Sequence, residues 1–421
     1  MSANTFLPHL IWQSLPRCGN RLWLKLAEEW PDWPRPLLDP PAALLKQLPR
    51  DAAAILSSRG LTGVAAPWQA EHDRVQSWLS ASDRHQLLCF EDDEYPPLLK
   101  QIDDAPPLLY VLGDATALNH PQLAIVGSRH ASHQGIGNAR QFAKDIASQG
   151  LAVTSGLALG IDTAAHEGAL AGNGITLAVL GTGVDVLYPA RNRSLAAQIT
   201  EQGGALVSEF PLGTTPQRSL FPKRNRLISG LSVGTIVVEA ALQSGSLSTA
   251  RHGMSQNRAV FAIPGSIHNP LSRGCHALIR EGATLLESTE QIAQEVTSLL
   301  AFHYQYSQYA VPRQLQRAEH LIAAEPASTA GREDVFKAVE PEPLLVAGHL
   351  SPKAGEGYYG FAEKSVPAHP LWQVLDDLPR PPDQLAELAN LAIEEVLGQL
   401  LQWELEGRVV LEPGGYSRFV G

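Results

Sequence analysis

Short apolar runs alternate with helical segments between residues 123 and 286, and this alternation restricts the fold more than any other feature. Each run is rich in β-branched or aliphatic residues and is apolar on both faces, as strands are when helices cover both sides of a sheet. Such an alternation predicts an α/β fold with a doubly wound, mostly parallel sheet and right-handed crossovers. The expected strands are Leu123–Val126, Leu151–Thr154, Thr176–Leu180, Ala205–Val207, Thr235–Glu239, Ala259–Ile263 and Thr284–Leu286.

The turns after these strands should meet at one edge of the sheet, where ligands of open α/β sheets bind. They combine glycine with serine, threonine or asparagine. Glycine lets the backbone approach an anion, and the helix that follows supplies unpaired N–H groups and a partial positive charge. The pattern predicts a phosphate-binding rim. Its turns are Gly127–Arg129, Ser155–Asp162, Gly181–Gly183, the basic loop Phe221–Arg226, Gln243–Thr249 and Pro264–Gly274.

Basic residues gather on the same part of the chain, although the whole protein has a net charge of -11. Between residues 210 and 280 there are eight basic residues and one acid, a net charge of +7. A local excess of one sign repels itself and is typical of a site for an anionic partner. The eight are Arg218, Lys223, Arg224, Arg226, Arg251, Arg258, Arg273 and Arg280. We expect Arg129, Lys223, Arg224, Arg226 and Arg273 to bring full charges to the rim.

Three classes of anionic ligand fit such a rim unequally. A dinucleotide cofactor would require G-x-G-x-x-G and an acid after the second strand, but position 140 is Arg and that strand ends in Ser155-Gly156. A nucleotide or sugar-phosphate enzyme, such as a phosphoribohydrolase of the lysine-decarboxylase-like kind, stays open because Asp162 and Glu239 could act as its acids. Single-stranded nucleic acid also stays open, since bases could stack on Phe210, Phe221 and Tyr188.

Other functional classes lack their signatures. The sequence contains no GxxxxGK[ST] phosphate loop. Three scattered cysteines, without CxxC spacing, argue against a disulfide framework or a structural zinc site and favour a reducing cytoplasm. We find no secretory leader and no apolar run long enough to cross a membrane, so we expect no membrane partner.

The flanks of the α/β region suggest separate domains. Residues 1–85 read as short helices with a Pro/Gly turn at residues 15–21, which resembles a helix-hairpin-helix turn but also fits an ordinary turn. Residues 304–367 lack sustained periodicity and read as a linker, partly disordered. Residues 368–421 read as three helices and a two-stranded wing, a winged helix. From residue 284 onward there are 20 acids and 9 bases, which favours protein contact over DNA reading for this module.

Several motifs occur in the order found in the DNA-processing protein A (Smf) family, and residues 86–290 resemble that family in register. The resemblance extends to the lead-in at Tyr95–Leu99 and Leu109–Gly113, and the flanks fit a sterile-alpha-motif-like N-terminus and a winged-helix C-terminus. The motifs within the α/β region are Val126–Ser132, Thr154–Asp162 with Ala165-His166, Phe221–Ser232, Ala259–Gly265, Ser272 to Gly274, Leu278-Ile279 and Gly282-Ala283.

The resemblance implies an extended Rossmann-like domain at residues 86–303 that binds single-stranded DNA. The protein would act in natural transformation in the cytoplasm, form a homodimer, protect incoming DNA and help load RecA recombinase, without catalysis, cofactor or metal. Leu278, Ile279 and Leu285 are candidate dimer contacts, but a position in the buried core is the favoured interpretation for them. The DNA-binding set would be Gly127, Ser128, Arg129, Ser155, Gly156, Phe221, Lys223, Arg224, Asn225, Arg226, Gly245, Ser246, Asn269, Ser272, Arg273 and Gly274.

Two departures from the family pattern concern this site. His133-Gln134-Gly135 stands where relatives often have Pro-Tyr-Gly, which could change the shape of the turn after the first strand. His276 stands where asparagine is frequent, which puts one polar DNA contact in doubt.

Overall fold

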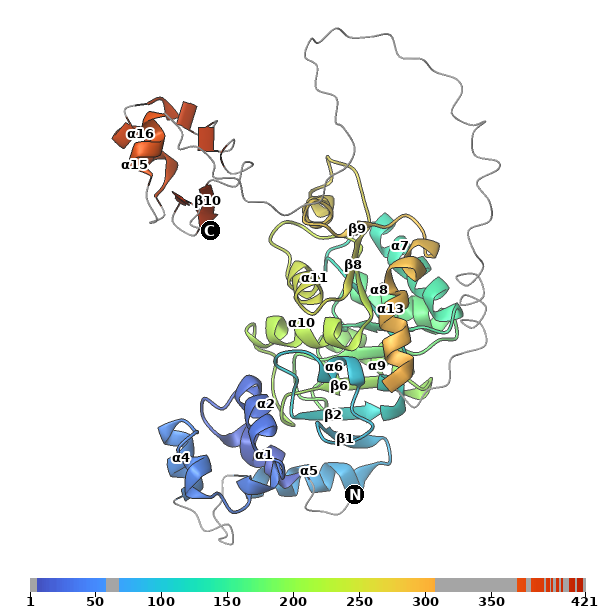
Figure 1. Cartoon of the computed structure of the whole chain (residues 1–421). Coiled ribbons are helices and arrows are strands. Elements are labelled where there is room, and N and C mark those ends of the chain that lie inside the picture. The colour runs from blue at the N-terminus through green and yellow to red at the C-terminus, as the bar shows by residue number, and fades with distance from the viewer. Residues whose placement is uncertain are drawn as a thin grey trace. The chain divides into compact units, whose positions relative to one another are not determined.

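The computed structural model describes residues 6–57, 68–306 and 369–375, and within the C-terminal region 380–389, 391–393, 395–396, 399–400, 403, 409–412 and 415–418. The chain divides into two compact units, residues 1–329 and 330–421 (Figure 1). The predicted linker falls largely on residues 307–367, which lie outside the described residues; its first three residues continue a helix that ends at Tyr306.

A nine-stranded sheet forms the centre of the first unit, with the strand order β1-β2-β6-β5-β4-β3-β7-β8-β9. All neighbours from β6 to β9 run parallel, whereas β1 pairs antiparallel with β2 and β2 antiparallel with β6. The doubly wound, mostly parallel sheet predicted from the sequence is confirmed. The strands are β1 (His85–Cys89), β2 (Leu108–Gly113), β3 (Gln122–Val126), β4 (Ala152–Ser155), β5 (Thr176–Val179), β6 (Ala205–Ser208), β7 (Gly234–Val237), β8 (Ala259–Ala262) and β9 (Thr284–Leu285).

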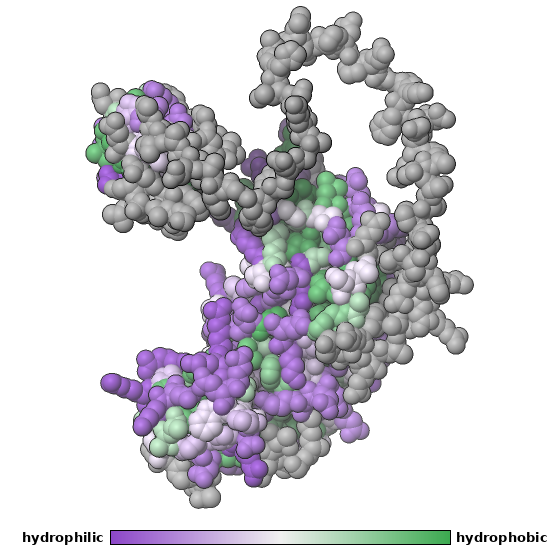
Figure 2. Space-filling model, viewed as in Figure 1, coloured by the Kyte–Doolittle hydropathy of each residue, from purple (hydrophilic) through white to green (hydrophobic). Residues whose placement is uncertain are grey.

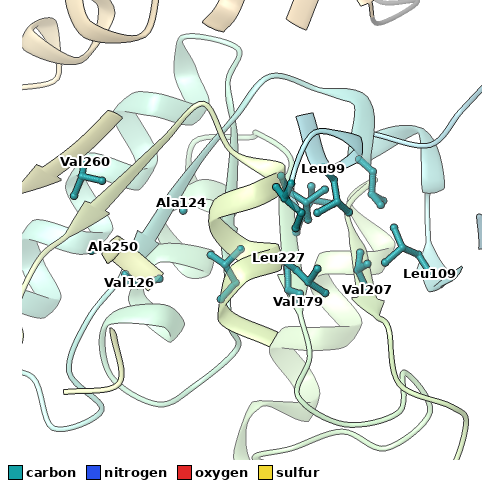
Figure 3. Packing of buried hydrophobic residues seen from close by; sticks show 14 of the residues in the cluster. Leu99, Leu109, Ala124, Val126, Val179, Val207, Leu227, Ala250 and Val260 are labelled. Atoms are coloured by element: carbon teal, nitrogen blue, oxygen red, sulfur yellow. The ribbon is translucent and has the colours of Figure 1, made fainter. Parts of the chain in front are cut away.

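Helices cover both faces of this sheet because successive strand residues point to opposite sides. Ala124 and Val126 of β3 belong to one buried cluster with helices α6, α10, α11 and α12, and Figure 3 shows Leu227 of α10 among strand residues such as Val179 and Val207. Leu123 and Ile125 belong to the opposite cluster with α7, α8 and α13, and α9 packs beside the N-terminal helices. These helices are α6 (Pro97–Lys100), α7 (His133–Ser148), α8 (Ile161–Ala171), α9 (Arg193–Glu201), α10 (Leu220–Leu231), α11 (Ser246–Ser255), α12 (Arg273–Arg280) and α13 (Glu290–Tyr306).

The N-terminal helices enclose a separate apolar cluster built around three tryptophans. The rings of Trp12, Trp23 and Trp33 meet edge to face with centroids 5.0 to 5.7 Å apart, a geometry that favours aromatic pairs. The helical N-terminal region predicted from the sequence is thus present. Its helices are α1 (Leu7–Ser14), α2 (Asn20–Glu29), α3 (Ala42–Leu45), α4 (Arg50–Ser57) and α5 (Gln69–Ala81). Short 3-10 turns lie at Arg35–Leu37, Ala115–Asn119, Ala190–Asn192 and Pro270–Ser272.

The C-terminal unit contains helices α15 (Pro370–Val374) and α16 (Pro382–Ala389) and the antiparallel pair β10 (Val409–Glu412) and β11 (Gly415–Arg418). The pair corresponds to the predicted wing. Only parts of the predicted third helix, Leu391–Leu405, fall within the described residues. Leu371, Val396 and Trp403 share a small apolar cluster. Across the described part of the chain, no helix is long and apolar enough to cross a membrane.

Candidate functional site

An open hollow of about 850 Å³ lies at the carboxyl end of β3, between the first turns of α10 and α11. Parallel strands place their carboxyl ends at this edge, so turns far apart in sequence meet there. Eight residues of the predicted DNA-binding set line it: Gly127, Ser128, Arg129, Phe221, Arg224, Asn225, Gly245 and Ser246. We call this space the central hollow.

The turn after β3 presents Arg129 to solvent. The carbonyl oxygen of Glu239 accepts a hydrogen bond from the Ser128 N–H at 2.7 Å, which anchors the turn to the chain that follows β7. Arg129 is exposed and makes no ion pair within the described residues. Its guanidinium carbon lies 5.5 Å from the centroid of the Phe221 ring, within the range of a cation–π contact. Arg129 is therefore held against the Phe221 ring while its charge forms no ion pair within the described residues.

The segment Phe221–Arg226 forms the first turns of helix α10, where the sequence suggested a basic loop. Pro222 fits the start of a helix because its missing N–H has no partner to lose there. The Phe221 ring packs so closely on Gly181 that a Cβ at that glycine would lie 2.7 Å from the ring. Tyr188, which is 44% exposed, lies with its ring centroid 5.8 Å from that of Phe221. Two rings and the Arg129 guanidinium thus line one side of the hollow.

Arg224 forms the floor of the hollow and is almost completely buried. Its guanidinium donates to the carbonyl oxygens of Gly156, at 3.0 Å, and of Val179. Burial lowers the pKa of Arg224 to about 10 even though the carboxylate of Asp162 opposes the shift. The buried guanidinium of Arg224 contributes positive potential to the hollow, but its hydrogen bonds to the backbone leave it unable to contact a phosphate directly.

Asp162 lies beside Arg224 at the first turn of α8. Its carboxylate accepts hydrogen bonds from the N–H groups of Gly156 at 3.1 Å and Ala158 at 3.3 Å. Burial raises the pKa of Asp162 to about 6, against the lowering influence of Arg224 and of both N–H groups. A side chain on Gly156 would collide with both charged groups, since its Cβ would lie 2.7 Å from Arg224 Nη2 and 2.8 Å from Asp162 Oδ2.

The carboxylate of Glu239 is hydrogen-bonded to Ser132 at the start of α7. Its carboxylate accepts a bond from the Ser132 N–H at 2.8 Å and from the Ser132 hydroxyl at 2.6 Å, and Ser132 in turn caps Gly135. A carboxylate at a helix N-terminus is stabilised by the helix dipole. Asp162 and Glu239, the acids considered for a phosphoribohydrolase, are therefore both engaged in backbone support.

The first turns of α10 and α11 direct partial positive charge into the hollow. No side chain caps α11 at Gly245, and none caps α10 at Ser219. The first N–H groups of a helix have no partner within the helix, so such an end attracts anions. Asn225 ties the two helices together by donating to Gly245 O at 3.2 Å and to Ser248 Oγ at 2.8 Å. Asn225 is thus a structural residue of the site.

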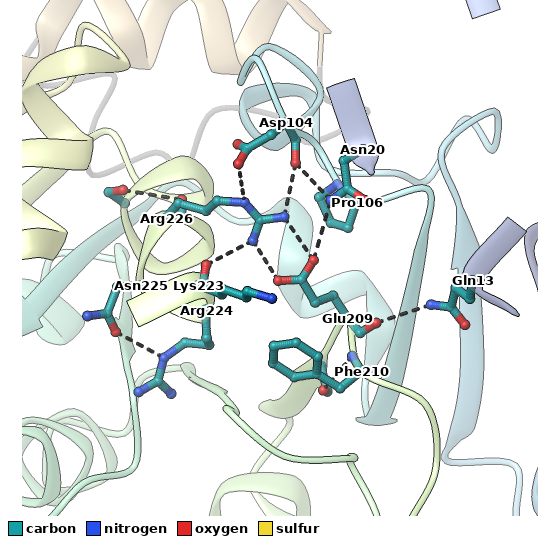
Figure 4. Close-up of polar contacts among 12 residues, drawn as sticks. Gln13, Asn20, Asp104, Pro106, Glu209, Phe210, Lys223, Arg224, Asn225 and Arg226 are labelled. Carbon is teal, nitrogen blue, oxygen red and sulfur yellow. Dashed lines mark hydrogen bonds and ion pairs between the residues drawn. The ribbon is translucent and has the colours of Figure 1, made fainter. Parts of the chain in front are cut away.

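Lys223 and Arg226 lie on the other side of α10 and line a second hollow of about 800 Å³. All of its lining residues belong to the first unit, and because it lies between the N-terminal helices and the sheet region we call it the interdomain hollow. Arg226 is 6% exposed and pairs with two carboxylates: Nε lies 2.7 Å from Asp104 Oδ2, and Nη1 lies 2.6 Å from Glu209 Oε1 (Figure 4). Burial alone would lower the pKa of Arg226, but Glu209 and Asp104 together raise it. The expectation that Arg226 contacts a ligand is corrected, because its charge is already compensated.

The remaining members of the predicted DNA-binding set are mostly structural. Ser155 is buried and donates to Ile125 O at 2.6 Å. Asn269 caps a 3-10 turn through Leu271 N, Ser272 is buried, and Gly274 donates from its N–H to Ala240 O at 2.8 Å. Arg273 is exposed but lies in a third hollow with His276, away from the central one. These positions hold the turns in place rather than face the hollow.

The three predicted dimer contacts differ in their exposure to solvent. Leu278 is 1% exposed and belongs to the core, as the favoured interpretation had it, so it is not available as a dimer contact. Leu285 on the edge strand β9 is 39% exposed, and Ile279 lines the same third hollow. Leu242 and Ile267, at 55% and 73%, add exposed apolar surface. In Figure 2 hydrophobic patches appear on the part of the sheet domain that carries β8 and β9 in Figure 1.

The structure adds Arg218 to the site and explains part of the charge excess. Arg218 is exposed, lines the central hollow and has no ion pair within the described residues. Its place in the basic stretch was the only signal in the sequence. Arg224, Arg226 and Arg258 are buried, and Arg251 pairs with Glu281 at 3.6 Å. Half of the eight basic residues therefore support the fold or are paired, and the free cations are fewer than the count suggests.

Two family models match the two units of this chain. Residues 86–297 match the family model described as DNA recombination-mediator protein A, and residues 362–415 match the DprA winged helix domain. The chain is 41% identical over 302 residues to Protein Smf of Escherichia coli (strain K12), covering 72% of this chain and 69% of that protein.

A second relative matches the α/β region. The chain is 47% identical over 178 residues to DNA processing protein DprA of Streptococcus pneumoniae, covering 42% of this chain and 62% of that protein. An X-ray structure of DNA processing protein A from Streptococcus pneumoniae superposes with a TM-score of 0.54 at 37% identity, covering 68% of this chain and 95% of that one.

Proposed function

The chain belongs to the DNA recombination-mediator protein A family, and from that premise we propose that it binds single-stranded DNA in the central hollow through the sugar-phosphate backbone. Arg129 and Arg218 carry the proposal, because both are exposed, line the hollow and have no ion pair within the described residues. Such cations neutralise phosphates by releasing condensed counterions, which is the main source of sequence-independent affinity for nucleic acids.

The aromatic side of the hollow favours unpaired bases. Phe221 and Tyr188 offer ring faces within 5.8 Å of each other, and base–aromatic stacking contributes about 1–3 kcal/mol per base. A paired base has its faces covered by its neighbours in the duplex, so stacking selects single strands. Asn225, the amide best placed for reading base edges, is committed to α11. We therefore expect little dependence on sequence.

Binding without bond cleavage fits the chemistry of the hollow better than phosphoribohydrolase activity does. A glycosidic bond would need a carboxyl group free to reach the sugar. Asp162 and Glu239 instead accept hydrogen bonds from backbone N–H groups or from Ser132. We propose that the protein works in the cytoplasm as a binding protein, which protects incoming single-stranded DNA in natural transformation and helps to load RecA recombinase onto it.

A homodimer would strengthen this binding by offering two hollows to one strand, since the second contact then forms at a high effective concentration. We propose the apolar surface at β9 as the dimer face, with Leu242, Ile279 and Leu285 as its contacts. Replacing the exposed Leu285 with glutamate should lower the dimer fraction in sedimentation at fixed concentration and leave the melting temperature close to that of the wild type. An unchanged dimer fraction would place the interface elsewhere.

The binding proposal is tested by a gel shift of a labelled oligothymidine in a salt series. Unlabelled single strand should compete and an equal mass of duplex should not, and the recovered oligonucleotide should be intact. Release of free base or phosphate from nucleotides would instead support the enzyme alternative. Equal competition by duplex would remove the stacking argument.

A further inference from the structure

We propose that the interdomain hollow is a second subsite for the same DNA strand, with Lys223 of α10 and Arg21 of the N-terminal helices as its phosphate contacts. This inference rests on the proposed function of the central hollow. The two hollows are neighbours, since Pro222 lines both of them. The first turn of α10 separates them, and it sends Phe221 to one side and Lys223 to the other. A strand that crosses this turn would pass from the first hollow into the second.

The charges inside the interdomain hollow are arranged to leave two cations free. Arg226 occupies both carboxylates, Asp104 and Glu209, and it also donates from Nη2 to the Asp104 carbonyl oxygen at 3.0 Å. Lys223 and Arg21 line the same space, are exposed and have no ion pair within the described residues. The five charged groups sum to +1, so the two carboxylates do not cancel the attraction for a phosphate.

Neither of the other polar features of the hollow opposes an anion. His252 is part of the lining, and burial lowers its pKa, so it is neutral at pH 7 and above. Helix α2 begins at Asn20, and its N-cap residue Gly19 provides no side-chain cap. Gly19 lines the hollow, so the positive end of the helix faces the same space as Arg21. Phe210 is partly exposed in the lining and offers a ring to a base.

The walls of the interdomain hollow are fixed to one another before any ligand arrives. Asn20 donates to the Asp104 carbonyl oxygen at 3.0 Å and lies 3.4 Å from Glu209 Oε2. Gln13 donates to the Glu209 carbonyl oxygen at 3.1 Å and accepts from the Tyr110 hydroxyl at 3.0 Å. Figure 4 shows Gln13 and Asn20 reaching toward Glu209 from the N-terminal helices, while Lys223 extends from α10. A preformed site loses less entropy on binding.

The inference predicts an effect that depends on the length of the DNA. Oligothymidines of about 4 to about 16 nucleotides span the range of site sizes of single-strand-binding modules. Lys223→Ala and Arg21→Ala should leave the affinity for the shortest bound oligonucleotide unchanged. For the longest, each loss of one phosphate contact should weaken binding about fivefold at about 0.1 M salt and reduce the salt slope by about 0.7. Lys25→Ala is the matched control, because Lys25 is exposed on α2 but lies outside the hollow and pairs with Glu29.

The outcomes separate this inference from the function on which it rests. Loss of affinity for long oligonucleotides alone supports the second subsite. Equal losses for short and long oligonucleotides would assign Lys223 to the central hollow and overturn the inference, as would no loss for either. Failure of the wild-type protein to bind any single strand would overturn the proposed function as well. Thermal melting of each variant confirms that the exposed substitutions leave the fold intact.

Discussion

Replacing Arg129 with alanine should weaken binding of single-stranded DNA by an amount that the structure allows us to calculate. Arg129 is exposed, makes no ion pair within the described residues and lines the central hollow, so it accounts for one phosphate contact. One contact on a single strand contributes about 0.7 to the slope of log K against log salt, or about fivefold in affinity at about 0.1 M salt. That factor corresponds to about 1 kcal/mol.

The assay is a filter-binding titration of an oligothymidine at several salt concentrations, repeated with a mixed-sequence oligonucleotide. We expect the same loss on both sequences, because a phosphate contact carries no sequence information. Arg129→Lys should retain the slope, since it keeps the charge, but lose part of the contact with Phe221. Arg193→Ala serves as the control, because Arg193 is exposed on α9 and lies outside the central hollow. An Arg129→Ala slope equal to that of the wild type would refute the assignment of Arg129 to the site.

Three further predictions concern the fold around the site. Arg226→Ala should lower the free energy of unfolding by about 3–5 kcal/mol, because the two carboxylates that it bridges would lose their partner; a urea-denaturation loss below about 1 kcal/mol would contradict the network. Gly160→Ala should cost about 1–3 kcal/mol, since φ is +81° and a Cβ would collide with the Ser128 carbonyl oxygen; an unchanged melting temperature would argue against this turn geometry. Burial lowers the pKa of His166 to about 3, so the unfolded chain binds the extra proton as the pH falls below about 6.5. Between pH 6.5 and pH 5 this group should cost about 2 kcal/mol of stability, and His166→Gln should remove that part of the pH dependence in urea titrations.

The strands of the parallel part of the sheet could be located in the sequence, because strands that are covered on both faces are short runs of apolar residues. All seven predicted strands occur, with ends within two residues of the expected positions. The antiparallel strands β1 and β2 were not among the predicted strands, since their pairing with each other and with β6 is a long-range event. Glycines in the predicted turns also correspond to positions where the backbone adopts a positive φ, as at Gly160.

The sequence by itself determined the doubly wound sheet, the edge at which its turns meet and eight of the residues that line the central hollow. Only the tertiary structure decided which cations are free. Arg224 and Arg226 stand two positions apart in one basic run, yet one forms the floor of the central hollow and the other bridges Asp104 and Glu209 on the opposite side of α10. The physical reason is that charge is a property of a residue, whereas compensation depends on which partner the fold brings within about 4 Å.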